Sequence, residues 1–235
     1  MKAALIAAGS GERLRAAGVS VPKPLVPIGG TPLVDRVLGA AAAAGLREVA
    51  CIFNEAADAV EAHCRRTWPD LVLHIVRRTT PSSMESLFAL APYLRDGRFV
   101  LLTVDAVFGP ELLPAFLQAA QGFPDADGVL AVHEFVDDEK PLRVALNARG
   151  QVTALGVEAA RAPTITAGLY VLAPRIFDEV DAARRGGLRA LREFFGHLLA
   201  RGYRLYGAPV AKTIDVDRPH DLAVAEAFVR SGFRA

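Results

Sequence analysis

Short apolar runs alternate with helical patterns along the first half of the chain. The runs are rich in Val, Ile, Leu and Ala, and the segments between them carry apolar residues at spacings of three and four. Strands that alternate with helices are typical of a parallel, doubly wound sheet. The predicted strands occupy residues 3–8, 48–53, 71–76 and 98–104.

The pattern changes after about residue 128, where several apolar runs follow one another with only short turns between them. We interpret these runs as a mixed or antiparallel part of the same sheet. Helical patterns return at 174–185 and 188–202, and a strand pair is expected at 203–210 and 212–216. A closing helix begins at Pro219, and Asp217 is its candidate N-cap.

The alanine-rich stretch near residue 40 predicts a buried amphipathic helix and not a membrane anchor, because it is short and its apolar residues keep helical spacing. Those residues are Leu33, Val34, Val37, Leu38 and Ala41.

Composition narrows the class of protein. The chain has 235 residues, of which 52% are hydrophobic, and we expect one domain spanning 1–235. Its 27 Lys and Arg against 26 Asp and Glu give no overall field that favours nucleic acid. The two cysteines, Cys51 and Cys64, show no metal-binding spacing and are expected to be reduced thiols. With no signal-peptide pattern or membrane span, we expect a cytoplasmic protein.

The first strand runs into a glycine loop, "AAGSGERL" at 7–14. Leu14 stands where a dinucleotide-binding fingerprint needs its third glycine, and Glu12 and Arg13 stand where a Walker loop needs lysine and a hydroxyl. What remains is a strand followed by a loop whose amides can face phosphate oxygens at a helix start. Lys23 follows between Pro22 and Pro24, which stiffen its backbone. An ordinary turn with solvated cations is the alternative.

The motifs "LIAAGSGERL" and "PKPLVPIGGTPLVDRVL" together resemble the nucleotidyltransferases that join a nucleoside triphosphate to a sugar 1-phosphate or a similar phosphorylated alcohol. "FVLLTVDAVF", "TITAGLYVL" and "KTIDVDRPHDLAVAEAF" extend the resemblance over most of the chain. The resemblance implies a Rossmann-like three-layer α/β/α fold of the nucleotide-diphospho-sugar transferase type, with a mixed, mostly parallel central sheet. It also implies a reaction that releases pyrophosphate.

The resemblance assigns roles to particular residues. Arg13 and Lys23 would contact the triphosphate and stabilise the transition state, and the loop amides would hold its oxygens. Mg²⁺ prefers carboxylates, phosphate oxygens and water, so aspartates at two strand ends, Asp105 and Asp215, are its expected ligands. Each aspartate has a simpler alternative as the cap of a turn. The loop residues are Ala8, Gly9, Ser10 and Gly11.

Two further segments are expected beside the substrates. "SSMESL" resembles the comparable segment of cytidylyltransferases for phosphocholine or inositol phosphate, which makes Ser83 and Glu85 candidates for nucleotide binding. Helix capping by Ser82 and its neighbours is the alternative. Thr166 and Gly168 are expected to form the acceptor wall, although the segment lacks the Glu-Lys pair that several relatives use there.

Two other functions remain open at this point. A nucleotide-sugar-dependent glycosyltransferase would use Asp215 and Asp217 as a metal-binding DxD motif, but it has no need of a triphosphate loop. A regulatory module would bind nucleotide without turnover. The expected partners are a nucleoside triphosphate and a phosphorylated sugar or alcohol, with no nucleic acid and no membrane, and a homodimer is an open alternative.

Overall fold

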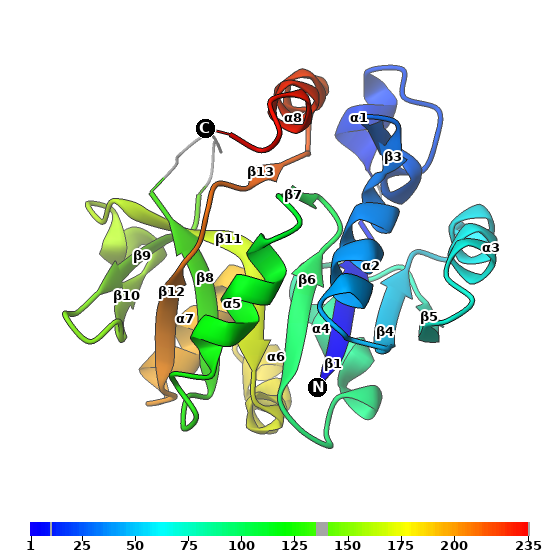
Figure 1. Ribbon diagram of the computed structural model, residues 1–235. Coiled ribbons are helices and arrows are strands. Elements are labelled where there is room, and N and C mark those ends of the chain that lie inside the picture. Colours follow the sequence, from blue (N-terminus) through cyan, green and yellow to red (C-terminus); the bar gives the residue numbers. More distant parts are fainter. Residues whose placement is uncertain (10, 135–140, 235) are drawn as a thin grey trace.

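A nine-stranded mixed sheet forms the centre of the protein, and helices cover both of its faces (Figure 1). The computed structural model describes residues 1–9, 11–134 and 141–234. Half of the sheet is parallel, as the alternating sequence pattern predicts. Its strands, in spatial order, are β5 (Val72–Arg77), β4 (Glu48–Phe53), β1 (Lys2–Ala7) and β6 (Phe99–Thr103).

The second half of the sheet joins β6 through the long antiparallel strand β11 (Thr164–Leu172). The other strands of this half are β8 (Gly128–His133), β9 (Arg143–Leu146), β10 (Val152–Leu155) and β12 (Leu205–Pro209). All of them except β12, which follows the helical segments, come from the region where the sequence shows only short turns. The expected mixed or antiparallel part of the sheet is therefore confirmed.

One detail of the predicted topology is wrong. Residues 203–216 do contain two strands, but they do not pair with each other. β12 pairs in parallel with β8, and β13 (Ile214–Asp215) pairs with the short strand β7 (Ala106–Val107). The apolar pattern shows that strands exist but not which neighbours they choose. A second small ribbon consists of β2 (Pro27–Ile28) and β3 (Thr31–Pro32).

Successive side chains of a strand point to opposite faces of the sheet, so each central strand contributes side chains to two hydrophobic cores, one on each face. Leu5 of β1 packs into the first core and Ile6 into the second. The helices that bury side chains in the first core are α1 (Glu12–Ala16), α2 (Leu33–Ala43), α3 (Asp58–Thr67), α5 (Leu112–Ala120) and α8 (Pro219–Arg230). Those of the second are α4 (Ser83–Leu90), α6 (Val180–Arg185) and α7 (Leu191–Ala200).

Helix α2 has the apolar face that the sequence predicts, because the same five positions that show helical spacing are its buried residues. Short 3₁₀ turns complete the fold: η1 (Lys23–Leu25), η2 (Ala91–Tyr93), η3 (Gly156–Ala159) and η4 (Pro174–Glu179). In the part of the chain that the structure describes, no helix is both long and apolar enough to cross a membrane.

Candidate active site

A pocket of about 350 Å³ opens at the carboxyl ends of the parallel strands β1 and β6. Ligands bind at this edge of open parallel sheets, because the loops that leave the strands spread apart there. Side chains and backbone from four segments distant in sequence form the wall. They are residues 6–9, 23–24, 80–83 with Ser86, and 103–105.

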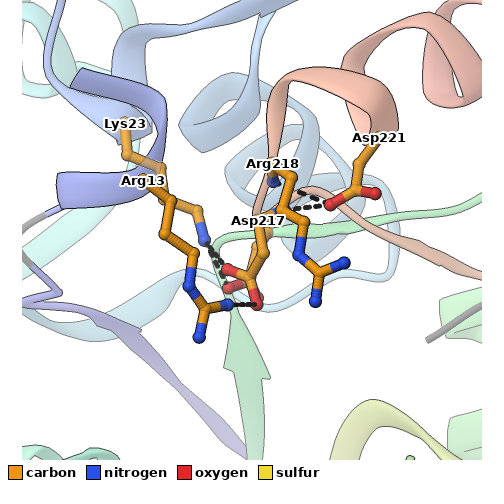
Figure 2. A network of polar contacts seen from close by, with 6 residues as sticks. Arg13, Lys23, Asp217, Arg218 and Asp221 are labelled. Atoms are coloured by element: carbon orange, nitrogen blue, oxygen red, sulfur yellow. Dashed lines mark hydrogen bonds and ion pairs between the residues drawn. The ribbon is translucent and has the colours of Figure 1, made fainter. Parts of the chain in front are cut away.

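Lys23 lies at the centre of the charged part of this wall. Its ammonium Nζ is 2.8 Å from Oδ2 of Asp105. The same Nζ is 2.6 Å from Oδ1 of Asp217 (Figure 2). The side chain is 11% exposed. Pro22 and Pro24 flank it, and the 3₁₀ turn η1 that begins at Lys23 fixes its direction. The sequence therefore predicted both the stiff backbone of Lys23 and its place in a pocket.

The charges around Lys23 stabilise its ionised form. Burial alone would lower the pKa of Lys23, but the negative charges of Asp105 and Asp217 and the hydrogen bonds to both raise it above its usual range. Burial would likewise raise the pKa of Asp105. The charge of Lys23 and hydrogen bonds from Lys23 and Thr103 outweigh that effect, so the pKa of Asp105 is lowered. The site thus holds an ammonium ion and a carboxylate together.

Strand pairing brings Asp105 and Asp215 together. Asp215 is opposite Ala106 in the ribbon of β7 and β13, and the Val216 amide donates to the Asp105 carbonyl at 3.0 Å. Burial raises the pKa of Tyr170 to about 12, and the charges of Asp215 and Asp105 act in the same direction. Two carboxylates predicted at separate strand ends therefore lie at one edge of the sheet.

Gly168 packs tightly against this carboxylate site. Its φ of +77° lies in the left-handed region, within a register shift of β11 against β8. A Cβ at this position would be 2.9 Å from Oγ1 of Thr103, 3.1 Å from Cβ of Ala106 and 3.8 Å from Oδ1 of Asp215. Glycine lets β11 approach the two aspartates closely. Thr166, the other predicted acceptor residue, is half-buried on the same strand and hydrogen-bonds Tyr170.

The glycine loop follows β1 into the pocket. Ala8 and Gly9 line the pocket, whereas Ser10 lies outside the described residues. Gly11 is the N-cap of α1 with φ of +63°, and a Cβ there would be 3.1 Å from Cβ of Lys23. Arg13 is 62% exposed and lies at the side of the pocket, with Nη1 3.8 Å from Oδ2 of Asp217.

Helix α4 presents its first turn to the pocket. Ser82 and Ser83 are both in the pocket wall, and the Oγ of Ser82 accepts a hydrogen bond from the Glu85 amide at 3.2 Å. Ser82 is therefore the N-cap of α4, as the capping alternative predicted. Both carboxylate oxygens of Glu85 accept hydrogen bonds from Arg184, at 2.9 and 2.7 Å. Glu85 thus faces α6, and its role in nucleotide binding stays a prediction.

The prediction that Asp217 caps α8 is wrong. The N-cap is Arg218, and Asp221 in the first turn accepts hydrogen bonds from the Asp217 and Arg218 amides at 2.9 and 2.7 Å. The Asp217 side chain caps no amide of α8 and instead contacts Lys23 and Arg13. The spacing of acidic residues around Pro219 fits either cap, so sequence alone did not distinguish them.

The sequence did not single out three polar residues of the pocket wall. Thr80 and Ser86 hydrogen-bond each other at 2.6 Å, and Thr103 donates to Asp105. Thr103 could have been found, because it is the polar end of an otherwise apolar strand, two residues before Asp105. Thr80 and Ser86 gave no comparable signal, since polar residues are common before and within a helix start.

Comparison with known proteins agrees with this geometry. Residues 3–201 match the family described as the MobA-like NTP transferase domain, which is most of the chain. The protein belongs to this family. As a member of the MobA-like NTP transferase family, it carries the fold that its sequence motifs implied.

Two curated relatives are similar in sequence. The bifunctional IPC transferase and DIPP synthase of Rubrobacter xylanophilus is 28% identical over 232 residues, which cover 97% of this chain and 51% of that protein. The CMP-5'-(3-aminopropyl)phosphonate synthase of Streptomyces rubellomurinus is 30% identical over 159 residues, 60% of this chain and 25% of that protein. The chain thus spans at most about half the length of these relatives.

Two solved structures share the fold. The inositol-1-phosphate CTP transferase from T. maritima superposes with a TM-score of 0.83 at 18% identity, covering 100% of this chain and 98% of that one. UDP-glucose pyrophosphorylase complexed with UDP-glucose gives a TM-score of 0.79 at 16% identity, covering 98% and 99%. These likenesses confirm the expected nucleotide-diphospho-sugar transferase type of fold.

Proposed function

We propose that the protein is a nucleotidyltransferase that joins a nucleoside triphosphate to a sugar 1-phosphate or a similar phosphorylated alcohol. An oxygen of the acceptor phosphate attacks the α-phosphorus and forms a new P–O bond. The bond from the α-phosphorus to the bridging oxygen breaks, and pyrophosphate leaves with the electron pair. Two observations support the proposal. The chain belongs to the NTP transferase family, and its pocket brings Lys23 and Asp105 together with the glycine loop.

The residues of the pocket suit the charges of this reaction. Attack brings two anions together, so cations are needed where negative charge builds up. We assign Lys23, the cation in the pocket wall, to the α-phosphate and the leaving oxygen. Arg13 at the side of the pocket is assigned to the outer phosphates. The backbone of Ala8, Gly9 and Gly11 is assigned to the remaining phosphate oxygens.

We further propose Mg²⁺ as the cofactor, held by Asp105 and Asp215. Among the described residues no group of three or more His, Cys, Asp and Glu side chains is placed to hold a metal ion alone. A pair of carboxylates suits Mg²⁺ nevertheless, because this ion completes its octahedron with substrate phosphate oxygens and water. When bound, it neutralises phosphate charge as a Lewis acid. Asp217 is kept apart from this pair, because its two oxygens face Lys23 and Arg13.

The first substrates to test are CTP and a polyol phosphate or phosphonate. One curated relative is named as a CMP-phosphonate synthase, and a structural neighbour is named as an inositol-1-phosphate CTP transferase. The "SSMESL" segment, which resembles cytidylyltransferases, forms part of the pocket wall here. These observations are the reason to test cytidylyl transfer first, before the transfer of other nucleotides to sugar 1-phosphates.

The test is an assay of pyrophosphate release with CTP, UTP, GTP, ATP and dTTP, each combined with sugar 1-phosphates, inositol phosphate, phosphocholine and phosphonates. We expect release that depends on both substrates and on Mg²⁺. Release of free nucleoside diphosphate from a nucleotide sugar would instead identify a glycosyltransferase. Triphosphate binding without product across the whole panel would indicate a regulatory module.

A further inference from the structure

The carboxylate of Asp217 lies between the two cations that the proposed function assigns to the triphosphate. Oδ1 is 2.6 Å from Nζ of Lys23, and Oδ2 is 3.8 Å from Nη1 of Arg13 (Figure 2). A phosphate group that contacted both cations would need this same position, because it too carries negatively charged oxygens at a short spacing. One internal anion therefore stands where a substrate anion is expected.

The backbone of Asp217 is fixed on both sides. The preceding residue, Val216, donates its amide to the Asp105 carbonyl, and Asp217 donates its own amide to Asp221 at 2.9 Å. The side chain is 51% exposed, against 27% for Asp105. Asp217 can therefore rotate into solvent without a change in the backbone, whereas Asp105 is held more closely. Of the two carboxylates bound to Lys23, Asp217 is the one that an incoming phosphate can displace.

The contact between Asp217 and Lys23 lowers the affinity of the site for an anionic substrate. The negative and positive charges around the site are equal in number. The carboxylates are those of Asp105, Asp215 and Asp217, and the cations are Arg13, Lys23 and Arg218, which lies beside Asp217 (Figure 2). A polyphosphate anion that binds Lys23 meets the negative charge of Asp217, whose Oδ1 is 2.6 Å from the same ammonium. It must also replace a charged hydrogen bond that already exists.

We infer that Asp217 is an internal counter-ion that competes with polyphosphate for Lys23 and Arg13, and so sets the affinity of the site for its anionic ligands. This inference rests on the proposed function, since that function assigns the two cations to phosphate. In the free protein, Asp217 helps to hold the Lys23 ammonium in place through their 2.6 Å contact. Binding then exchanges one anion for another instead of burying a new pair of charges.

The test is calorimetric titration of pyrophosphate into the full chain without divalent metal, at low and at physiological ionic strength. Asp217→Asn removes the charge and keeps the size, so pyrophosphate should bind about tenfold more tightly, which is about 1.4 kcal/mol. The gain should shrink as salt screens the site. Glu12→Gln is the matched control, because it removes one charge at the exposed first turn of α1, next to Arg13. It should change the affinity less than twofold.

Two further variants separate competition from a structural role. In a Lys23→Ala background, Asp217→Asn should tighten pyrophosphate binding much less, because the Lys23 ammonium for which Asp217 and pyrophosphate compete is absent. Asp217→Ser serves the same purpose if Asp217→Asn fails to fold, as judged by circular dichroism. Unchanged or weaker pyrophosphate binding by a folded Asp217 variant, with the wild type binding, would overturn the inference and leave the proposed function standing. Failure of the wild type to bind pyrophosphate or any triphosphate would overturn the proposed function itself.

Discussion

Gly168→Ala tests whether β11 must approach the carboxylates as closely as the structure shows. The added Cβ would lie 2.9 Å from Oγ1 of Thr103 and 3.1 Å from Cβ of Ala106, well inside ordinary contact distances of about 3.5–4 Å. The left-handed backbone, with φ of +77°, costs alanine about 1–2 kcal/mol. Overpacking adds about 1–3 kcal/mol, so we expect the free energy of unfolding to fall by about 2–5 kcal/mol in total.

Gly202→Ala provides a matched control for the backbone term. Gly202 has a similar φ of +81°, but a Cβ there meets no atom within 4 Å. This variant should lose only about 1–2 kcal/mol, and the effect of glycine on the unfolded chain cancels in the comparison. The difference between the free energies of unfolding of the two variants therefore measures the contribution of the close packing between β11 and the residues around Gly168.

Urea unfolding measures this difference, followed by circular dichroism and by fluorescence of the single tryptophan, Trp68. Activity should fall further than the folded fraction explains, because relief of the clash moves Thr103, which hydrogen-bonds Asp105, or Ala106, which is paired with Asp215. The reasoning would be refuted if Gly168→Ala were no less stable than Gly202→Ala, or if it retained wild-type turnover.

Three other substitutions probe the charged groups. Lys23→Ala should lower kcat about 100- to 1,000-fold in the substrate panel assay while the circular dichroism spectrum is kept, because it removes the cation assigned to the leaving group; an unfolded variant would make Lys23 structural. Asp105→Asn should lower Mg²⁺-dependent turnover about 100-fold or more, and unchanged turnover would remove Asp105 from the metal site. The hydrogen bonds and charge of Arg184 lower the pKa of Glu85, so this pair stabilises the fold fully above the unfolded pKa of about 4.3 and less as pH falls through the folded pKa. Glu85→Gln should therefore cost about 0.5–1 kcal/mol in urea unfolding at pH 7 and progressively less below pH 4, and a cost independent of pH would contradict this.

The sequence predicted those features that depend on local pattern. The apolar spacing of α2 matches its buried face, and the apolar run before Asp105 is a buried central strand. The prolines on either side of Lys23 indicated a fixed side chain, and the structure places it in the pocket wall. Periodicity and backbone restriction are properties of neighbouring residues, so they can be read without tertiary contacts.

Features that depend on the choice between partners could not be predicted in this way. Asp217 and Asp221 are both suited to the start of α8, and only the folded geometry shows that Asp221 satisfies the amides. The sequence proposed Glu85 for nucleotide binding, and only the fold shows its ion pair with Arg184, which is 99 residues away in sequence. The pairing of β12 with β8 is likewise a contact between distant segments. In each case the partner is determined by which distant residues the fold brings together, and the local sequence pattern carries no information about such contacts.

The most direct test of the central claim is ³¹P nuclear magnetic resonance of the products formed from a nucleoside triphosphate and its acceptor in the presence of Mg²⁺. We expect one new phosphoanhydride that links the nucleoside monophosphate to the acceptor phosphate, with an equal amount of pyrophosphate, and about 100- to 1,000-fold slower formation of both products with the Lys23→Ala variant. Inorganic phosphate or nucleoside diphosphate in place of pyrophosphate would contradict the central claim.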